Sequence, residues 1–375
     1  MTLRKALFWL HLTAGCVCGA IILLMSVTGV LLTYERQMIA WGEWGGFRAP
    51  PPASGEPPMS LNALVEGVRL TEPGRPTSLT VRSGPEDPVA VRIGRDRTVY
   101  VNAYSGEVLG EGSGAWRAFF SSLRGWHRWL AMRGDDREVG KAITGASNLA
   151  FMFILISGIY MWWPRPWTRN RLASVTLFRR GLNGKARDFN WHNVIGFWSA
   201  ALLFLIVLSG SVISYRLMSD AVYQAVGEAP PQRSRPASKK LVEKRTTAPE
   251  TVDFEAVFAT AREQFPDWES ITIPLPESAT KTLTVALDRG SGGQPHLKSS
   301  VIVEAATAKL VRREDFGDNT LGRRLRLLLR FIHTGEAGGL AGQTLAGIVT
   351  VGACVLVYTG IALSLRRLSA WLGRF

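Results

Sequence analysis

The chain has 375 residues, enough for more than one domain; 46% of them are hydrophobic, and the formal net charge is +14. The basic residues cluster beside long apolar runs, so the charge indicates membrane topology and argues against a nucleic-acid-binding surface. Cys16, Cys18 and Cys354 all lie within apolar runs, which argues against structural disulfide bonds.

Four windows of the sequence contain no Asp, Glu, Lys or Arg. They are residues 6–34, 142–164, 193–215 and 337–365. Each is longer than the roughly 20 residues that a helix needs to cross the hydrocarbon core, so the sequence predicts four transmembrane helices. The first window resembles a signal peptide, but its apolar part is too long and no small-residue cleavage site follows. We interpret it as a retained anchor.

Basic residues in short loops predict the orientation of these helices. The loop at 166–190 is rich in Arg and Lys, and so are the residues before the first window and after the last. We therefore expect a multi-pass protein of the bacterial inner membrane, with both chain ends in the cytoplasm and two long connections in the periplasm.

Both long connections are typical of small α+β domains, with Gly, Pro and Asp between strand-like runs. The first predicts a helix over 61–70 and strands over 78–82, 89–93 and 98–102. The second predicts a helix over 252–264 and strands over 271–273, 283–287 and 300–303.

The two halves of the chain match each other residue by residue. At one constant offset, His11 matches His192, Gly15 matches Gly196, and Thr28-Gly29 matches Ser209-Gly210. Before the second window of each half stand His127 and His333, and Ser157-Gly158 matches Thr359-Gly360. The pattern indicates two repeats of the same topology, related by an axis along the membrane normal.

The predicted fold is an integral membrane α-helical bundle of four transmembrane helices in two parallel-topology repeats, with two periplasmic α+β domains. The expected boundaries are 1–35 for the first transmembrane helix, 36–120 for the first periplasmic domain, 121–165 for an interfacial helix and the second transmembrane helix, 166–190 for the cytoplasmic loop, 191–216 for the third transmembrane helix, 217–320 for the second periplasmic domain, 321–367 for an interfacial helix and the fourth transmembrane helix, and 368–375 for the tail.

Four of the five histidines belong to the repeat, and their predicted depth sorts them into pairs. His11 and His192 lie near the cytoplasmic face, whereas His127 and His333 lie near the other. Two neutral imidazoles facing each other in an apolar bundle suit the axial ligation of a haem iron. A single such histidine is more often a hydrogen-bonded interfacial residue. Four histidines at equivalent positions of the two repeats favour the interpretation that they are haem ligands. His296 has no counterpart, and we interpret it as a solvated loop residue or a substrate contact.

A haem also needs small residues beside its ring and cations for its propionates. Glycines supply the small residues, although glycines in membrane helices also suit close helix packing. The candidate cofactor-binding residues are His11, His192, His127, His333, Gly15, Gly196, Arg124, Arg128 and Arg330, with the histidines as iron ligands in the pairs His11–His192 and His127–His333. We expect two haem groups and no catalytic side chain beyond them.

Other cofactors fit the sequence less well. It has no HExxH, no Cys/His cluster at zinc spacing, no GxGxxG after a strand and no P-loop. The cytoplasmic loop is too short for a flavin or nicotinamide domain. We therefore expect a separate electron donor, either a cytoplasmic reductase or a quinol.

Several segments, in this order, resemble PepSY-associated transmembrane proteins, also called iron-regulated membrane proteins. They are the helix with His11 and Thr28-Gly29, the segment 99–110, Gly125-Trp126-His127-Arg128-Trp129, and Tyr160-Met161-Trp162-Trp163-Pro164-Arg165. Within that family the chain resembles the FoxB-type ferric-siderophore reductases, which implies PepSY-like periplasmic domains, two b-type haems and electron transfer to Fe(III) in a periplasmic siderophore of hydroxamate type. Fe(II) binds hydroxamates weakly, so reduction would release the metal.

One departure from the family pattern lies in the second exported segment. Residues Glu304 to Ala308 stand where the pattern has a Tyr-x-Gly turn. The alternative hypothesis is a non-enzymatic PepSY-bearing scaffold or protease regulator in which the histidines are structural.

Overall fold

The computed structural model describes residues 2–44, 47–94, 97–163, 168–231, 252–277, 280–290 and 292–372. The chain divides into two compact units. The helical unit comprises Met1–Glu35, Ala118–Val226 and Leu325–Phe375, and the sheet unit comprises Arg36–Arg117 and Gly227–Arg324. The Pro164-Arg165 end of the family-like motif lies outside the described residues.

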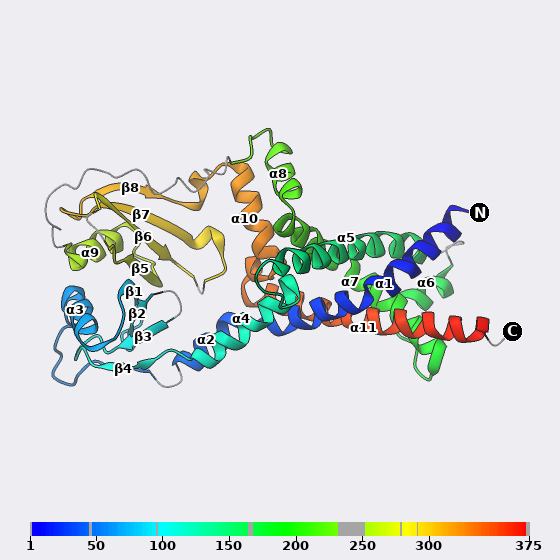
Figure 1. Ribbon diagram of the computed structural model, residues 1–375, viewed down its shortest axis with the longest axis horizontal. Coiled ribbons are helices and arrows are strands. Elements are labelled where there is room, and N and C mark those ends of the chain that lie inside the picture. The colour runs from blue at the N-terminus through cyan, green and yellow to red at the C-terminus, as the bar shows by residue number, and fades with distance from the viewer. Residues whose placement is uncertain are drawn as a thin grey trace. The chain divides into compact units, whose positions relative to one another are not determined.

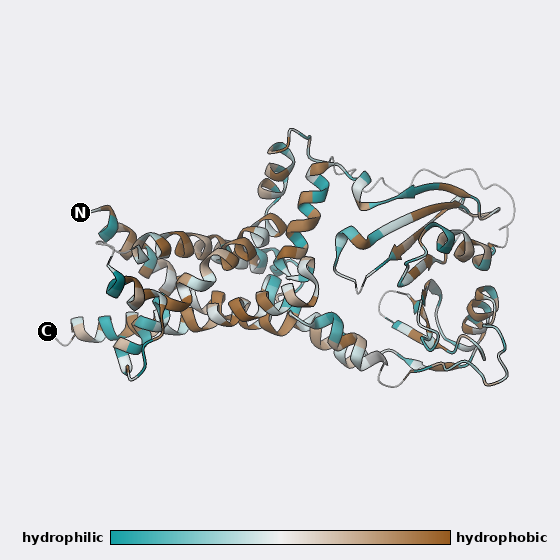
Figure 2. Cartoon of the chain, turned by 180° about the vertical axis from the view of Figure 1, so that it is seen from behind, coloured by the Kyte–Doolittle hydropathy of each residue, from teal (hydrophilic) through white to brown (hydrophobic). Residues whose placement is uncertain are grey.

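Four long apolar helices form the helical unit, which confirms the four helices predicted from the charge-free windows. They are α1 (Leu3–Leu32), α5 (Asp136–Trp162), α7 (Gly184–Ser214) and α11 (Gly339–Leu372). Each is long and apolar enough to cross a membrane, and the hydropathy colours of Figure 2 show that hydrophobic residues predominate along them. The helices run side by side, and α1 and α7 each pack against both α5 and α11 (Figure 1). The helices α1 and α7 therefore lie diagonally across the bundle.

Shorter helices precede or follow the long ones along the chain. They are α2 (Glu35–Trp44), α4 (Gly114–Trp129), α6 (Arg169–Thr176), α8 (Arg216–Gln224) and α10 (Leu321–His333). The helices α4 and α10 carry His127 and His333 in their last turns. The basic loop predicted after α5 contains α6, whose first turn is capped by the Thr168 hydroxyl, which accepts a hydrogen bond from the backbone N–H of Arg171.

The sheet unit is built on one antiparallel sheet of eight strands, in the order β4-β3-β2-β1-β5-β6-β7-β8. The strands are β1 (Pro76–Arg82), β2 (Val89–Ile93), β3 (Arg97–Val101), β4 (Val108–Glu111), β5 (Ser270–Pro274), β6 (Thr282–Asp288), β7 (Lys298–Glu304) and β8 (Leu310–Glu314). The sequence predicts a separate domain in each half, but β1 pairs with β5 and joins the halves into one sheet. This pairing covers two edges that would otherwise offer free backbone groups.

The core of the sheet unit lies between one face of the sheet and two helices, α3 (Leu61–Thr71) and α9 (Phe254–Gln264). Buried and exposed residues alternate along β6 and β7, as expected where one sheet face is covered. Ser60 and Asp253 cap the two helices, because each side chain accepts a hydrogen bond from a backbone N–H in the first turn.

Truncation of Leu79 should destabilise the sheet unit strongly. Leu79 is 0% exposed and lies opposite Ile273 where β1 meets β5. Its replacement by alanine removes packed methyl groups and should cost about 3 kcal/mol of stability. Thermal unfolding of the full protein in detergent measures this. Leu70→Ala is the control, because Leu70 is 79% exposed on α3; equal losses from the two changes would contradict the placement of the core.

Candidate functional site

His127 and His333, which we call the outer pair, lie close together in the helical unit, and His11 and His192 are called the inner pair. The ring centroids of His127 and His333 are 6.1 Å apart, with planes inclined by 57°. An iron bound by two imidazole nitrogens at about 2 Å each would hold the ring centroids about 6 Å apart, so the spacing fits. Burial, and after it the nearby His333, lower the pKa of His127 to about 4, and burial also lowers the pKa of His333. Both rings are therefore neutral at neutral pH, as iron ligands must be.

The inner pair lies on the two diagonal helices. His11 belongs to α1 and His192 to α7, and His11 lies close enough to act electrostatically on His192. The structure thus brings His11 near His192 and His127 beside His333, the same pairs that the repeat predicts. That each pair holds a haem iron stays a prediction.

All four imidazoles make the same kind of hydrogen bond. In each, Nδ1 contacts the hydroxyl of a Ser/Thr-Gly pair on a neighbouring helix of the same half of the chain. The distances are 2.9 Å from His11 to Ser157, 2.9 Å from His192 to Thr359, 3.0 Å from His127 to Thr28, and 3.4 Å from His333 to Ser209.

The hydroxyls also determine which ring nitrogen carries the proton. Each already donates its one proton to a carbonyl of its own helix, as Thr359 does to Val355 at 2.8 Å. Ser157, Thr28 and Ser209 do the same at 2.7 to 2.8 Å. Each hydroxyl oxygen must therefore accept from Nδ1–H. In the outer pair the carbonyls of Met25 and Ile206 also accept from Nδ1, at 2.9 and 2.8 Å.

This tautomer leaves Nε2 unprotonated in all four rings. Within the described part of the chain, Nε2 makes no hydrogen bond in any of them. A metal-bound histidine normally donates its other N–H to an oxygen that fixes the ring, and these rings show that arrangement.

Glycines let each imidazole lie close against the neighbouring helix. A Cβ added at Gly158 would lie 3.4 Å from His11 Cε1, and one at Gly210 would lie 3.1 Å from His333 Cε1. A Cβ added at Gly360 would lie 3.4 Å from His192 Cε1, and one added at Gly29 would lie 3.5 Å from His127 Cε1. Four Ser/Thr-Gly pairs therefore each supply an acceptor and a flat surface.

The two glycines singled out for ring clearance lie one turn after the inner histidines, on the same helix face. A Cβ at Gly15 would meet nothing within 4 Å, and one at Gly196 would meet a single atom of Leu356 at 3.6 Å. The space beside the inner pair is therefore suited to a flat ring.

The three candidate propionate partners flank the outer histidines. Arg124 and Arg128 share α4 with His127, and Arg330 lies one turn before His333 on α10. Burial lowers the pKa of Arg124, whose guanidinium pairs with Glu35. The pKa of Arg128 is lowered first by burial and then by neighbouring guanidiniums, including those of Arg330 and Arg124. Cations thus gather at this end of the bundle.

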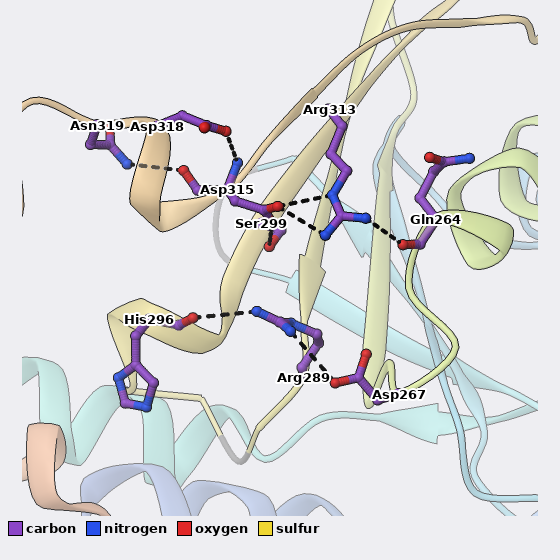
Figure 3. A network of polar contacts seen from close by, with 9 residues as sticks. All are labelled: Gln264, Asp267, Arg289, His296, Ser299, Arg313, Asp315, Asp318 and Asn319. Atoms are coloured by element: carbon purple, nitrogen blue, oxygen red, sulfur yellow. Dashed lines mark hydrogen bonds and ion pairs between the residues drawn. The ribbon is translucent and has the colours of Figure 1, made fainter.

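His296 is set apart from the other four histidines. It is exposed in the sheet unit, and its backbone carbonyl accepts a hydrogen bond from Arg289. Figure 3 shows its ring turned away from a polar network in which Asp315 accepts from Ser299 and pairs with Arg313. His296 belongs to the sheet unit, whereas the four repeat histidines belong to the helical unit.

Sequence reasoning missed the role of the hydroxyls. It treated Thr28, Ser157, Ser209 and Thr359 only as small residues, although the recurrence of Ser or Thr before Gly on four helices was the available signal. Among the described residues, no three His, Cys, Asp or Glu side chains gather as a metal site. Two imidazoles suffice for a haem, whose ring supplies the other ligands.

Comparison with protein families gives one match. The model of the family described as the PepSY-associated TM region matches residues 8–367, a range that includes all four repeat histidines. The search of curated proteins gave no match.

Proposed function

The chain belongs to the family of the PepSY-associated TM region, and from this premise we propose that it is a di-haem b ferric-siderophore reductase of the bacterial inner membrane. It takes electrons from a cytoplasmic reductase or a quinol and delivers them to Fe(III)-siderophore in the periplasm, releasing Fe(II) for iron uptake. The observation that carries this proposal is the shared tautomer of four paired imidazoles, each with Nδ1–H donated to a hydroxyl and Nε2 left for a metal.

The side chains of this protein bind and orient, and none acts as acid, base or nucleophile. When bound, haem supplies one-electron exchange between Fe(III) and Fe(II). His11 and His192 would hold the inner group, and His127 and His333 would hold the outer one. Arg128 and Arg330 would pair with the propionates of the outer group, and Arg124, whose charge Glu35 already balances, would add to the positive field there.

The arrangement of the chain in the membrane supports an electron path in one direction. The basic segments beside the helices favour a cytoplasmic position for both chain ends and for the loop that contains α6. The sheet unit is then periplasmic, and the two halves of the chain form two repeats of the same topology. His11 lies near the start of α1, whereas His127 contacts Thr28 near its end, so the two pairs would lie near opposite membrane faces.

The absorption spectrum of the purified protein tests this function. We expect a Soret band, sharp α and β bands after dithionite addition, and about two haems per chain by the pyridine haemochrome assay. Reduced protein should then be reoxidised by ferric siderophore, with Fe(II) captured by a ferrous chelator. A colourless protein from haem-replete cells would overturn the proposal and favour the scaffold or protease-regulator alternative.

A further inference from the structure

Four guanidiniums gather where α4 turns into α5. The charged neighbours that act on Arg128 are Arg137, Arg330 and Arg124. Two of the four lie over one indole ring: the guanidinium carbons of Arg128 and Arg137 are 4.9 and 4.0 Å from the ring centroid of Trp129. Arg128, Arg137 and Arg330 are exposed, so their charged groups can be reached from solvent.

The charges of this cluster are not balanced by the protein. Glu35 pairs with Arg124. No carboxylate in the described chain pairs with Arg128, Arg137 or Arg330, and Glu138, next to Arg137, pairs with Lys141. The two propionates of a haem in the outer site would balance Arg128 and Arg330. One positive charge then remains, that of Arg137 over Trp129.

The turn that carries this cluster is held rigidly. Leu130 and Ala131 have φ of 54° and 56°, a left-handed conformation that residues other than glycine rarely adopt. The N–H of Ala131 donates to the carbonyl of Gly125 at 3.0 Å, and the Thr144 hydroxyl donates to the carbonyl of Arg128 at 2.8 Å. The lack of a side chain at Gly140 leaves room for the backbone carbonyl of Trp129, which an added Cβ would meet. The indole and its cations are therefore preorganised.

We propose that Arg137, over the ring of Trp129, forms a docking contact for Fe(III) chelates of net negative charge, such as those with free carboxylates or catecholates. This inference rests on the proposed reductase function and narrows its substrate class away from neutral or cationic hydroxamates. Guanidinium groups bind carboxylates through charge-assisted, two-pronged hydrogen bonds, and the field of the cluster draws anions toward the outer histidines.

Redox-inert Ga(III) chelates test the contact without electron transfer. We would measure their binding to the haem-loaded full chain in nanodiscs by calorimetry, with Ga(III)–citrate as the anionic probe and a neutral Ga(III) trihydroxamate as the comparison. We expect Ga(III)–citrate to bind more tightly, and its affinity to fall as salt screens the cluster. Arg137→Gln should weaken its binding about tenfold.

Two further variants make the result specific. Arg133→Gln removes an equally exposed guanidinium from outside the cluster and should leave binding unchanged, whereas Arg137→Lys keeps the charge and should retain most of it. Equal affinity for the two chelates, or equal losses from Arg137→Gln and Arg133→Gln, would overturn the inference. A wild-type protein without haem overturns the reductase function instead, which separates the two failures.

Discussion

Replacing His127 by alanine should lower the haem content of the purified protein from about two per chain to about one. The ring centroid lies 6.1 Å from that of His333, so in the proposed site each imidazole would be the second axial ligand for the iron that the other binds. The loss leaves one ligand, and the reduction of ferric siderophore should fall to the background rate because the exit of the electron path is gone. The haemochrome assay measures the first effect and ferrous-chelator absorbance the second.

The same experiment separates the outer pair from the inner one. His333→Ala should remove the same haem as His127→Ala, whereas His11→Ala or His192→Ala should remove the other haem and leave the outer spectrum intact. His296→Ala is the matched control, because that ring is exposed in the sheet unit. If His11→Ala removes the haem that His127→Ala removes, the pairing by depth is wrong.

The membrane helices could be predicted because their signal is local. A run without charges must be shielded from water, and each predicted window lies almost wholly within a helix. The helix ends were harder to predict, because α7 begins at Gly184, well before the charge-free window that starts at 193. Helical hydrogen bonding continues past the apolar boundary, and the added turns are held by the buried Asp188, which pairs with Arg187 and Arg366. The partner Arg366 lies far along the chain, so no local pattern reveals it.

The strands show the same division between local and distant information. A strand-like run between turn residues predicted a strand over 89–93, and β2 has these bounds. The pairing of β1 with β5 joins residues that lie nearly two hundred positions apart in the sequence. Several strands have the same alternation of apolar and polar residues, so this pattern alone does not determine which strands pair. Thr80 and Thr272 form a hydrogen bond at this junction, but threonine pairs recur in any sheet.

The candidate site could be predicted from the sequence because both halves of the chain contain its residues. Repetition singled out the four histidines and their pairing, which one copy alone would not do. It did not reveal the hydroxyl acceptors, because a small residue before glycine in an apolar helix is equally typical of close packing. Nor did it reveal Arg137 over Trp129, since that contact needs the left-handed turn at Leu130 and Ala131.

Replacing Thr359 by valine should loosen the inner haem while leaving the outer one in place. Valine keeps the volume of threonine but removes the oxygen that accepts from His192 Nδ1–H at 2.9 Å. A buried donor without its partner costs about 1–3 kcal/mol, and loss of such a supporting hydrogen bond typically weakens metal binding 10- to 100-fold. Haem transfer to apomyoglobin measures the retention of each haem, and a redox titration measures the potential of the haem that remains loosely held.

Serine at the same position separates the hydroxyl from its packing. Thr359→Ser keeps the acceptor and loses only a methyl group, so it should retain the inner haem nearly as well as the natural protein. Thr28→Val provides the converse comparison, because it removes the hydroxyl that accepts from His127 and should loosen the outer haem alone. Its effect should be weaker than that of Thr359→Val, because the Met25 carbonyl still accepts from Nδ1 of His127 at 2.9 Å. If Thr359→Val and Thr359→Ser released haem equally fast, the hydroxyl would be a packing residue, and the tautomer of His192 would have to be fixed by another group.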